Sequence, residues 1–260
     1  AEGSAAAPPR GVAAAAADPC YVIYTSGSTG VPKGVGCHHE GAVNTLDDVN
    51  VRHGIGASDA CIALSSLSFD LSVYDIFGLL SVGGRVVLPD ATHTSPPQPS
   101  EWLSLAEREG VSVWNSVPAF VELLVGEAEV SGRRLPACLR VVLLSGDWIP
   151  LSLPPRLLSL CGGVSGGGSG LRVVSMGGAT EAAVWSVTHE VAGGLAPLGW
   201  SSVPYGVPMR GQSMDVLDDR GHRRCEPWAV GVIYIGGCGV ALGYMGDAAQ
   251  TDKQFVRHAR

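Results

Sequence analysis

Short apolar runs alternate with longer amphipathic stretches along most of this chain. Runs of four or five residues that are rich in valine, isoleucine and leucine, and that are bounded by glycine or polar residues, are typical of strands. We therefore predict strands at residues 21–24, 61–64, 85–88, 111–114, 140–144 and 171–174. The longer stretches repeat apolar residues at helical spacing, which predicts helices at residues 71–81, 101–109, 119–125 and about 154–160.

The stretch 71–81 shows the amphipathic pattern most clearly. Its apolar positions are Leu71, Val73, Ile76, Phe77 and Leu80. Ser100 and Gly110 are the predicted N-terminal cap and C-terminal stop of the next helix. Strands and helices in series form a mostly parallel sheet covered by helices, so the expected fold class is α/β. Ligands of such sheets bind in loops beyond the carboxyl ends of the strands.

Composition divides the chain into three parts. Residues 1–19 are rich in alanine and proline and are predicted to be a linker. Residues 20–205 carry the α/β pattern and are the predicted ligand-binding core. Residues 206–260 change to short strands, at 214–217 and 232–235, which predicts the start of a smaller β-rich subdomain.

Charge and cysteine content exclude several classes of protein. The net charge is −7 with no basic cluster, which argues against a nucleic-acid partner. No apolar run is long enough to span a bilayer, so no membrane partner is expected. The seven cysteines are scattered without a Cys-x-x-Cys pair. This argues against a zinc site or a disulfide framework and favours a reducing, cytosolic setting.

A glycine- and hydroxyl-rich segment, TSGSTGVPKG at residues 25–34, directly follows the first predicted strand. Backbone N–H groups and short hydroxyls suit the oxygens of a polyphosphate, and Lys33 adds a positive charge. A plain surface turn is the alternative, but the preceding strand and the Pro-Lys-Gly ending favour a phosphate loop. The motif is not a Walker P-loop, which needs Gly-Lys-Ser/Thr opening a helix. The predicted phosphate contacts are Thr25, Ser26, Gly27, Ser28, Thr29, Gly30, Lys33 and Gly34.

The loop YTSGSTGVPKG resembles the signature of the acyl-adenylate-forming superfamily, which includes acyl-CoA ligases, luciferases and the adenylation domains of nonribosomal peptide synthetases. Further segments follow in the family's order: HHEGAVN, FDLSVYDIF, NSVPAF, LLSGDW, GGATEA and GVIYIGGCGVALGY. The resemblance covers about residues 20–260. It implies the core of the large N-terminal domain of these enzymes, ATP and Mg²⁺ as cofactors, and a supporting role for His39 behind the nucleotide.

In GGATEA the resemblance makes Glu181 the Mg²⁺ ligand and Thr180 a contact of the α-phosphate, and we group both as catalytic. A carboxylate beside phosphates suits Mg²⁺, which prefers oxygen ligands. The other nucleotide contacts that it implies are Gly177, Gly178 and Ala179. The chain departs from the commoner family form at Gly177, where an aromatic residue often stacks on adenine, and at Ser175, which replaces a frequent asparagine.

Asp70 shifts the expected substrate toward an amino acid. Its place at the start of a predicted helix would also suit an N-terminal cap. In peptide-synthetase adenylation domains, an aspartate at this point of the FDxS motif pairs with the α-ammonium group of the amino acid. Acyl-CoA ligases and luciferases have no such need.

The resemblance carries over nine pocket positions: Asp70, Leu71, Tyr74, Asn115, Leu143, Ser145, Met176, Val184 and Trp185. The large Tyr74, Met176 and Trp185 would leave room only for a small side chain. Asn115 and Ser145 add limited polarity. The set is similar to those of cysteine-selecting adenylation domains, including ones that feed thiazoline formation, so L-cysteine is the expected substrate.

The resemblance also implies partners: a phosphopantetheinyl carrier domain, whose thiol accepts the activated amino acid, and neighbouring synthetase modules. The chain stops where the family continues toward its lysine-bearing C-terminal subdomain, so we expect a fragment that is nearly inert alone. Two alternatives stay open. One is an acyl- or aryl-CoA ligase, and Asp70 argues against it. The other is a degenerate module that binds nucleotide without catalysis, and the departures at Ser175 and Gly177 are consistent with it.

Overall fold

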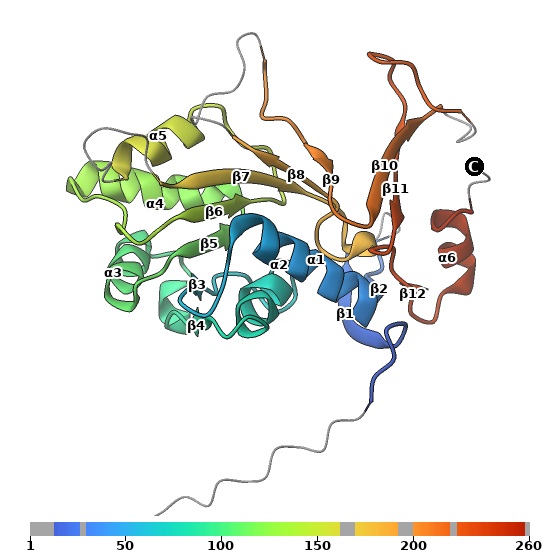
Figure 1. Cartoon of the computed structure of the whole chain (residues 1–260), viewed down its shortest axis with the longest axis horizontal. Helices are drawn as coiled ribbons and strands as arrows, with labels where there is room; N and C mark the ends of the chain where they lie inside the picture. The colour runs from blue at the N-terminus through green and yellow to red at the C-terminus, as the bar shows by residue number, and fades with distance from the viewer. Residues whose placement is uncertain (1–12, 27–29, 162–169, 192–199, 219–222, 258–260) are drawn as a thin grey trace, which may run out of the picture.

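The computed structural model describes residues 13–26, 30–161, 170–191, 200–218 and 223–257. Within them lies a mixed α/β fold built on a seven-stranded sheet (Figure 1). In spatial order its strands are β4 (Arg85–Val87), β3 (Ala60–Ile62), β5 (Val113–Ser116), β6 (Val141–Leu144), β7 (Arg172–Gly177), β8 (Val187–Glu190) and β9 (Val207–Pro208). Strands β4 to β7 pair in parallel, and β8 and β9 follow antiparallel at one edge. The predicted, mostly parallel sheet is confirmed.

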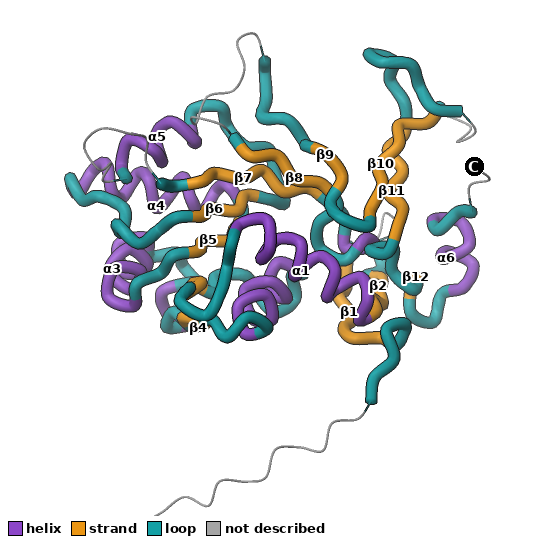
Figure 2. Tube along the Cα trace, viewed as in Figure 1, coloured by secondary structure: helices purple, strands orange, loops and turns teal. Residues whose placement is uncertain are grey.

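The helices between the strands cover both faces of this sheet (Figure 2). They are α1 (His39–His53), α2 (Leu71–Val73), α3 (Pro99–Glu109), α4 (Pro118–Ser131) and α5 (Leu153–Leu160), with shorter 3₁₀ turns at Ala91–His93 and Thr180–Ala182. The last helix, α6 (Ala248–Gln254), follows β12 and lies away from this sheet (Figure 1). No helix in the described ranges is long and apolar enough to cross a membrane.

The ends of α3 test two predictions. Gly110 ends the helix in the left-handed conformation with φ of 66°, as predicted. The predicted cap at Ser100 is wrong, because the helix already begins at Pro99 after Gln98, and no side chain caps it. Proline suits the first helical position, because an N–H group there would have no partner within the helix.

Alternate residues of the central strands feed two separate cores. In β6, Val142 and Leu144 pack in the core that includes α3, α4 and α5, whereas Val141 and Leu143 pack in the core that includes α1. This is the period of two that a strand imposes on its side chains. Burial on both faces is typical of parallel strands, and it explains why the apolar runs in the sequence are continuous.

Two smaller sheets stand beside the main one (Figure 1). β1 (Pro19–Thr25) and β2 (Lys33–His38) form an antiparallel hairpin, and β12 (Gly243–Tyr244) pairs with β2. β10 (Gln212–Leu217) and β11 (Val232–Gly237) form a second antiparallel pair. The first predicted strand therefore lies outside the parallel series, because the connection to its neighbour is too short for a parallel crossover.

The helix predicted at 71–81 contains a π-helical turn at Tyr74–Gly78. Two residues of the apolar pattern, Phe77 and Leu80, are 58% and 54% exposed. The wider turn changes the helical period, so the buried face continues through Leu79 instead. Turns of this kind are frequent at functional sites.

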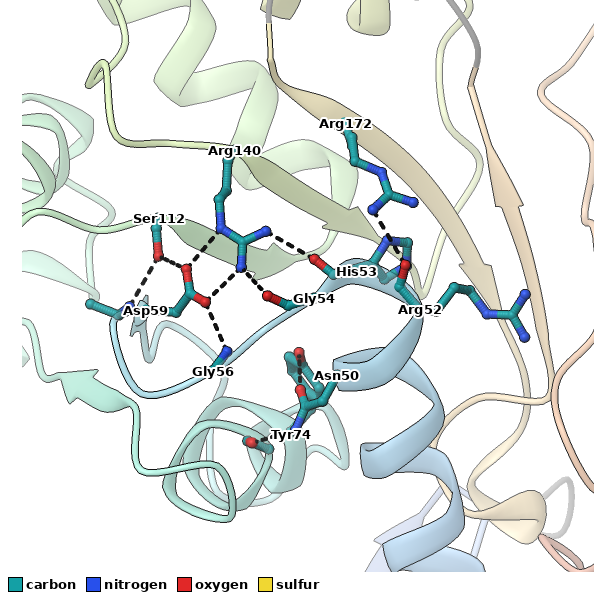
Figure 3. A network of polar contacts seen from close by, with 12 residues as sticks. Asn50, Arg52, His53, Gly54, Gly56, Asp59, Tyr74, Ser112, Arg140 and Arg172 are labelled. Atoms are coloured by element: carbon teal, nitrogen blue, oxygen red, sulfur yellow. Dashed lines mark hydrogen bonds and ion pairs between the residues drawn. The ribbon is translucent and has the colours of Figure 1, made fainter.

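A polar network holds the amino-terminal edge of the main sheet (Figure 3). Arg140, just before β6, donates hydrogen bonds of 2.8 and 2.6 Å to the two carboxylate oxygens of Asp59. It also donates to the backbone carbonyls of His53 and Gly54, at 2.9 Å each. Ser112, just before β5, donates to Asp59 at 2.7 Å. The network ties the C-terminal end of α1 to the residues that precede β3, β5 and β6. Ligands of such sheets bind at the opposite, carboxyl end of the strands.

Candidate active site

The loop that follows β7 turns back on itself at the carboxyl edge of the sheet. A Cβ atom on Gly178 would lie 2.6 Å from the carbonyl oxygen of Val184, so only glycine fits the closest point of the turn. Ala183 and Val184 have left-handed φ angles of 56° and 72°, which is costly for a β-branched residue. Thr180 and Glu181 lie in the 3₁₀ turn between these points. Backbone strain of this kind clusters at ligand sites.

Asp70 lies against this turn. It is 5% exposed, and Thr180 Oγ1 donates a hydrogen bond of 2.7 Å to its Oδ2. Asp70 makes no capping bond to the helix that begins at Leu71, so the capping interpretation is wrong. Burial raises the pKa of this carboxyl above its ordinary value of 3.8, although the bond from Thr180 opposes the rise. Within the described part of the chain no cation pairs with it, and a buried carboxylate of this kind favours a cationic ligand.

A cavity of about 160 Å³ opens beside Asp70. Its lining residues are Phe69, Asp70, Leu71, Ser145, Gly146, Gly178, Ala179, Thr180, Val184 and Trp185. Two polar atoms of this lining, Ser145 Oγ and Trp185 Nε1, are buried and have no hydrogen-bond partner among the described residues. Ser145 and Trp185 therefore give this lining a limited polar character.

Four of the predicted pocket residues do not line this cavity. Tyr74, Asn115 and Leu143 are fully buried in the surrounding core. Tyr74 packs against Trp185 with ring centroids 5.1 Å apart, so it can shape the cavity only through that ring. Asn115 donates hydrogen bonds within the core. Met176 lines a second, larger cavity.

This second cavity has a volume of about 660 Å³ and meets the first at Gly146 and Gly178, which line both. The end of β7 contributes Ser175, Met176 and Gly177, and the aromatic lining residues are Trp148, Trp200 and Tyr205. Of the predicted nucleotide contacts in GGATEA, Gly177 and Gly178 lie here, whereas Ala179 lines the smaller cavity. The loop after β7 thus lines both cavities.

The predicted phosphate loop connects β1 to β2. Thr25 ends β1, Ser26 and Gly30 lie in the loop, Lys33 and Gly34 begin β2, and Gly27, Ser28 and Thr29 lie outside the described residues. Lys33 Nζ lies 5.4 Å from the ring centroid of Tyr244. The Cys37 thiol of β2 donates to the carbonyl oxygen of Thr180 at 3.4 Å. The hairpin is therefore bound directly to the turn that carries Thr180.

Glu181 accepts a hydrogen bond of 2.7 Å from the Tyr244 hydroxyl at Oε1. Burial and this bond raise the pKa of Tyr244 to about 12, so the hydroxyl stays protonated and donates. Among the described residues, no group of three or more His, Cys, Asp or Glu side chains could cage a metal. A single carboxylate nevertheless fits Mg²⁺, which takes its remaining oxygens from phosphates and water. Glu181 suits an ion shared with a nucleotide.

Three residues to which sequence reasoning assigned no role contribute to this region. The resemblance points to His39, but the ring that makes the contacts is that of His38, which caps α1 and whose Nε2 lies 3.0 Å from the carbonyl oxygen of Val240. Tyr205 and Tyr244 also reach the loop after β7. Both come from distant parts of the chain, so no local pattern marks them.

Comparisons with known proteins identify relatives of this chain. Residues 1–245 match the family model of AMP-binding enzymes. Pyochelin synthetase PchF of Pseudomonas aeruginosa is 48% identical over 255 residues, which are 98% of this chain and 13% of that protein. The anguibactin system regulator of Vibrio anguillarum is 46% identical over 242 residues, 93% of this chain and 22% of that protein. The chain thus spans less than a quarter of the length of these relatives.

A solved structure extends the likeness to three dimensions. The nonribosomal peptide synthetase FmoA3, in a form bound to alpha-methyl-L-serine-AMP, is 42% identical with a TM-score of 0.83. The match covers 93% of this chain and 26% of that chain.

Proposed function

This chain belongs to the family of AMP-binding enzymes, and on that premise we propose that it activates an amino acid as an aminoacyl adenylate for nonribosomal peptide synthesis. The observation that carries the proposal is the buried Asp70 carboxylate between the Thr180 turn and a small cavity. An α-ammonium group bound there would neutralise the carboxylate. A charge-assisted bond of this kind is worth about 1.5–3 kcal/mol.

The arrangement suits attack by a carboxylate on ATP. With its ammonium group on Asp70 and its side chain in the small cavity, an amino acid would present its carboxylate toward the Thr180 turn. A carboxylate oxygen then bonds to the α-phosphorus, the bond from that phosphorus to the β-phosphate oxygen breaks, and pyrophosphate leaves. Catalysis of such a transfer is largely positioning and charge neutralisation. We assign the α-phosphate contact to Thr180 and the hold on Mg²⁺ to Glu181, with the ion supplying charge neutralisation when bound.

We propose L-cysteine as the substrate. The cavity of about 160 Å³ is small, and Leu71 and Val184 make part of its wall apolar. Ser145 adds limited polarity to the lining, which suits a thiol because a thiol does not require a strong hydrogen bond. The likeness to a pyochelin synthetase and the similarity of the pocket to cysteine-selecting domains support this choice.

An amino acid with a side-chain hydroxyl is the second candidate. The related FmoA3 is described in a form bound to alpha-methyl-L-serine-AMP. Serine is nearly isosteric with cysteine, and a pocket rejects such a competitor weakly. Burial of the hydroxyl against the mostly apolar wall would disfavour serine by about 1–3 kcal/mol, or about 5- to 150-fold.

We also propose partners and a cellular setting for this reaction. The activated amino acid passes to the thiol of a phosphopantetheinyl carrier domain, and further synthetase modules act beside this one, since each curated relative described above is much longer than this chain. The seven cysteines are free thiols, which suits a reducing cytosol.

The test is ATP–pyrophosphate exchange by the enzyme that carries this chain, with a panel of cysteine, serine, alanine, leucine and phenylalanine. We expect cysteine to give the highest kcat/KM and serine to follow about 5- to 150-fold lower. A faster rate with serine or with a larger amino acid would overturn the choice of cysteine. Exchange with fatty or aryl acids alone would favour an acyl-CoA ligase, and nucleotide binding without any exchange would favour a degenerate module.

A further inference from the structure

The ring of Tyr205 occupies the space where a side chain at position 177 would begin. A Cβ atom on Gly177 would lie 2.6 Å from Tyr205 Cζ and closer still to Cε2. No other residue therefore fits at Gly177 while the ring is in place. The Tyr205 hydroxyl donates a hydrogen bond of 3.4 Å to the carbonyl oxygen of Gly178, the next residue of the same loop. Glycine at 177 and tyrosine at 205 form a matched pair.

The backbone around Tyr205 holds the ring in this place. Gly206 has φ of 116°, and a Cβ atom there would lie 2.5 Å from the carbonyl carbon of Thr188. Only glycine permits the chain to approach β8 this closely. The next residue, Val207, begins β9 and pairs with Thr188 of β8. The sheet edge fixes one end of the Tyr205 side chain, and the bond to Gly178 fixes the other.

The ring is half-buried, and Tyr205 lines the cavity of about 660 Å³. Trp148 and Trp200 line the same cavity, which is therefore rich in aromatic surface. It meets the small cavity beside Gly178, two residues before Thr180. A nucleotide whose α-phosphate reaches Thr180 would extend its base into this larger space, where flat aromatic faces favour a planar heteroaromatic ring.

We propose that Tyr205 is the stacking platform for the nucleobase, and that it supplies from a distant part of the chain the aromatic face that Gly177 cannot provide. This inference rests on the proposed function, because it needs a nucleotide with its phosphates at the Thr180 turn. Of the three aromatic lining residues, Tyr205 is the one whose ring packs on the end of β7. Its preorganised ring needs no rearrangement to accept a base.

The experiment is calorimetric titration of the enzyme that carries this chain, and of its variants, with Mg-ATP and with Mg-tripolyphosphate, which has no base. The wild type should bind ATP more tightly than tripolyphosphate. Tyr205→Ala should weaken ATP binding about tenfold and change tripolyphosphate binding less than about twofold, because only stacking is lost. Tyr205→Phe keeps the ring and should stay within about twofold of the wild type.

Moving the aromatic ring from position 205 to position 177 distinguishes a loss of stacking from a local disruption of the structure. Gly177→Tyr alone should lose affinity for ATP, because two rings cannot share one space. Gly177→Tyr combined with Tyr205→Ala should recover most of the affinity that Tyr205→Ala loses. Unchanged ATP binding in Tyr205→Ala, or an equal loss for both ligands, would overturn the inference and leave the proposed function intact. A wild-type enzyme that binds neither ligand would contradict the proposed function itself, and the inference with it.

Discussion

Asp70 and Glu181 both lie next to Thr180, and their surroundings suit them to different ligands. Asp70 is almost fully buried, and burial raises its pKa, so it is best matched by a cation that enters the cavity with the substrate. Glu181 is less buried and is oriented by the Tyr244 hydroxyl. A partly exposed, oriented carboxylate suits a hydrated metal ion that also binds phosphates.

Glu181→Gln removes the charge that we assign to Mg²⁺ and keeps the size of the side chain. We expect ATP–pyrophosphate exchange to fall at least about tenfold, or about 1.4 kcal/mol of barrier. Glu190→Gln is the matched control, because Glu190 is exposed and pairs with Arg172 outside both cavities. Exchange that is unchanged in Glu181→Gln, or reduced equally in both variants, would remove Glu181 from the site.

The buried His53 side chain should make the free energy of unfolding depend on pH. Burial, aided by the positive charges of Arg172 and Arg52, lowers the pKa of this imidazole from 6.5 to about 4. The unfolded chain therefore takes up a proton between these two pH values while the folded chain does not. The free energy of unfolding should fall as the pH drops from about 6.5 to about 4, by a total of about 3 kcal/mol from this group.

His53→Leu isolates this contribution. Urea unfolding at several pH values should show a shallower loss of stability below about pH 6.5 in the variant than in the wild type. The pKa of Asp75 is raised to about 6 by burial and acts in the opposite direction, but it is common to both proteins and cancels in the difference. Parallel stability curves would show that His53 is not buried as a neutral ring.

The residues at the amino and carboxyl ends of the strands in the main sheet have different roles. The amino-terminal edge is held by the Arg140–Asp59 network, and the carboxyl edge carries the strained loop and the two cavities. Hydrogen bonds from Arg140 and Ser112 outweigh the effect of burial and hold the pKa of Asp59 below its ordinary value. The network is therefore a stabilising device, in keeping with its distance from the candidate site.

Arg140→Met should lower the free energy of unfolding by about 2–4 kcal/mol, because it leaves the buried Asp59 charge without its cation. Arg156→Met is the matched control. Arg156 also binds a carboxylate, that of Glu129, but both side chains of that pair are substantially exposed. We expect its loss to cost less than about 1 kcal/mol in the same denaturant titration. Equal losses in the two variants would contradict the structural role of the network.

Patterns of local sequence predicted most of the elements but not how they pair. The strand predicted at residues 140–144 is marked by an unbroken apolar run at residues 141–144, because both of its faces are buried. The π-helical turn at Tyr74–Gly78 is not visible in a pattern that assumes one helical period. Nothing local shows that β2 pairs with β1 and with the distant β12, because that choice depends on tertiary packing.

The candidate site was predictable to the extent that motifs marked it. The cavity beside Asp70 does bring Ser145 and Trp185 together with the Thr180 turn. Tyr205 and Tyr244 were missed, because each reaches the loop after β7 through a contact between residues far apart in the chain. Such contacts follow from the fold and leave no periodic signal.

In the whole molecule, the two cavities adjoin each other at Gly146 and Gly178. A small cavity with a buried carboxylate adjoins a larger aromatic one, and both lie at the loop after β7. This geometry suits a small substrate with a cationic group beside a nucleotide. The reacting groups would then meet near Thr180. The proposed function requires that Asp70 binds the ammonium group of the substrate.

The most direct test compares L-cysteine with 3-mercaptopropionic acid, which lacks only the amino group, in ATP–pyrophosphate exchange by the enzyme that carries this chain. We expect kcat/KM to be about 10- to 150-fold higher for cysteine, the value of one charge-assisted bond. In Asp70→Asn this preference should collapse, because activity with cysteine falls and activity with the analogue does not. Equal use of both substrates by the wild type, or a preference that survives in Asp70→Asn, would contradict the account.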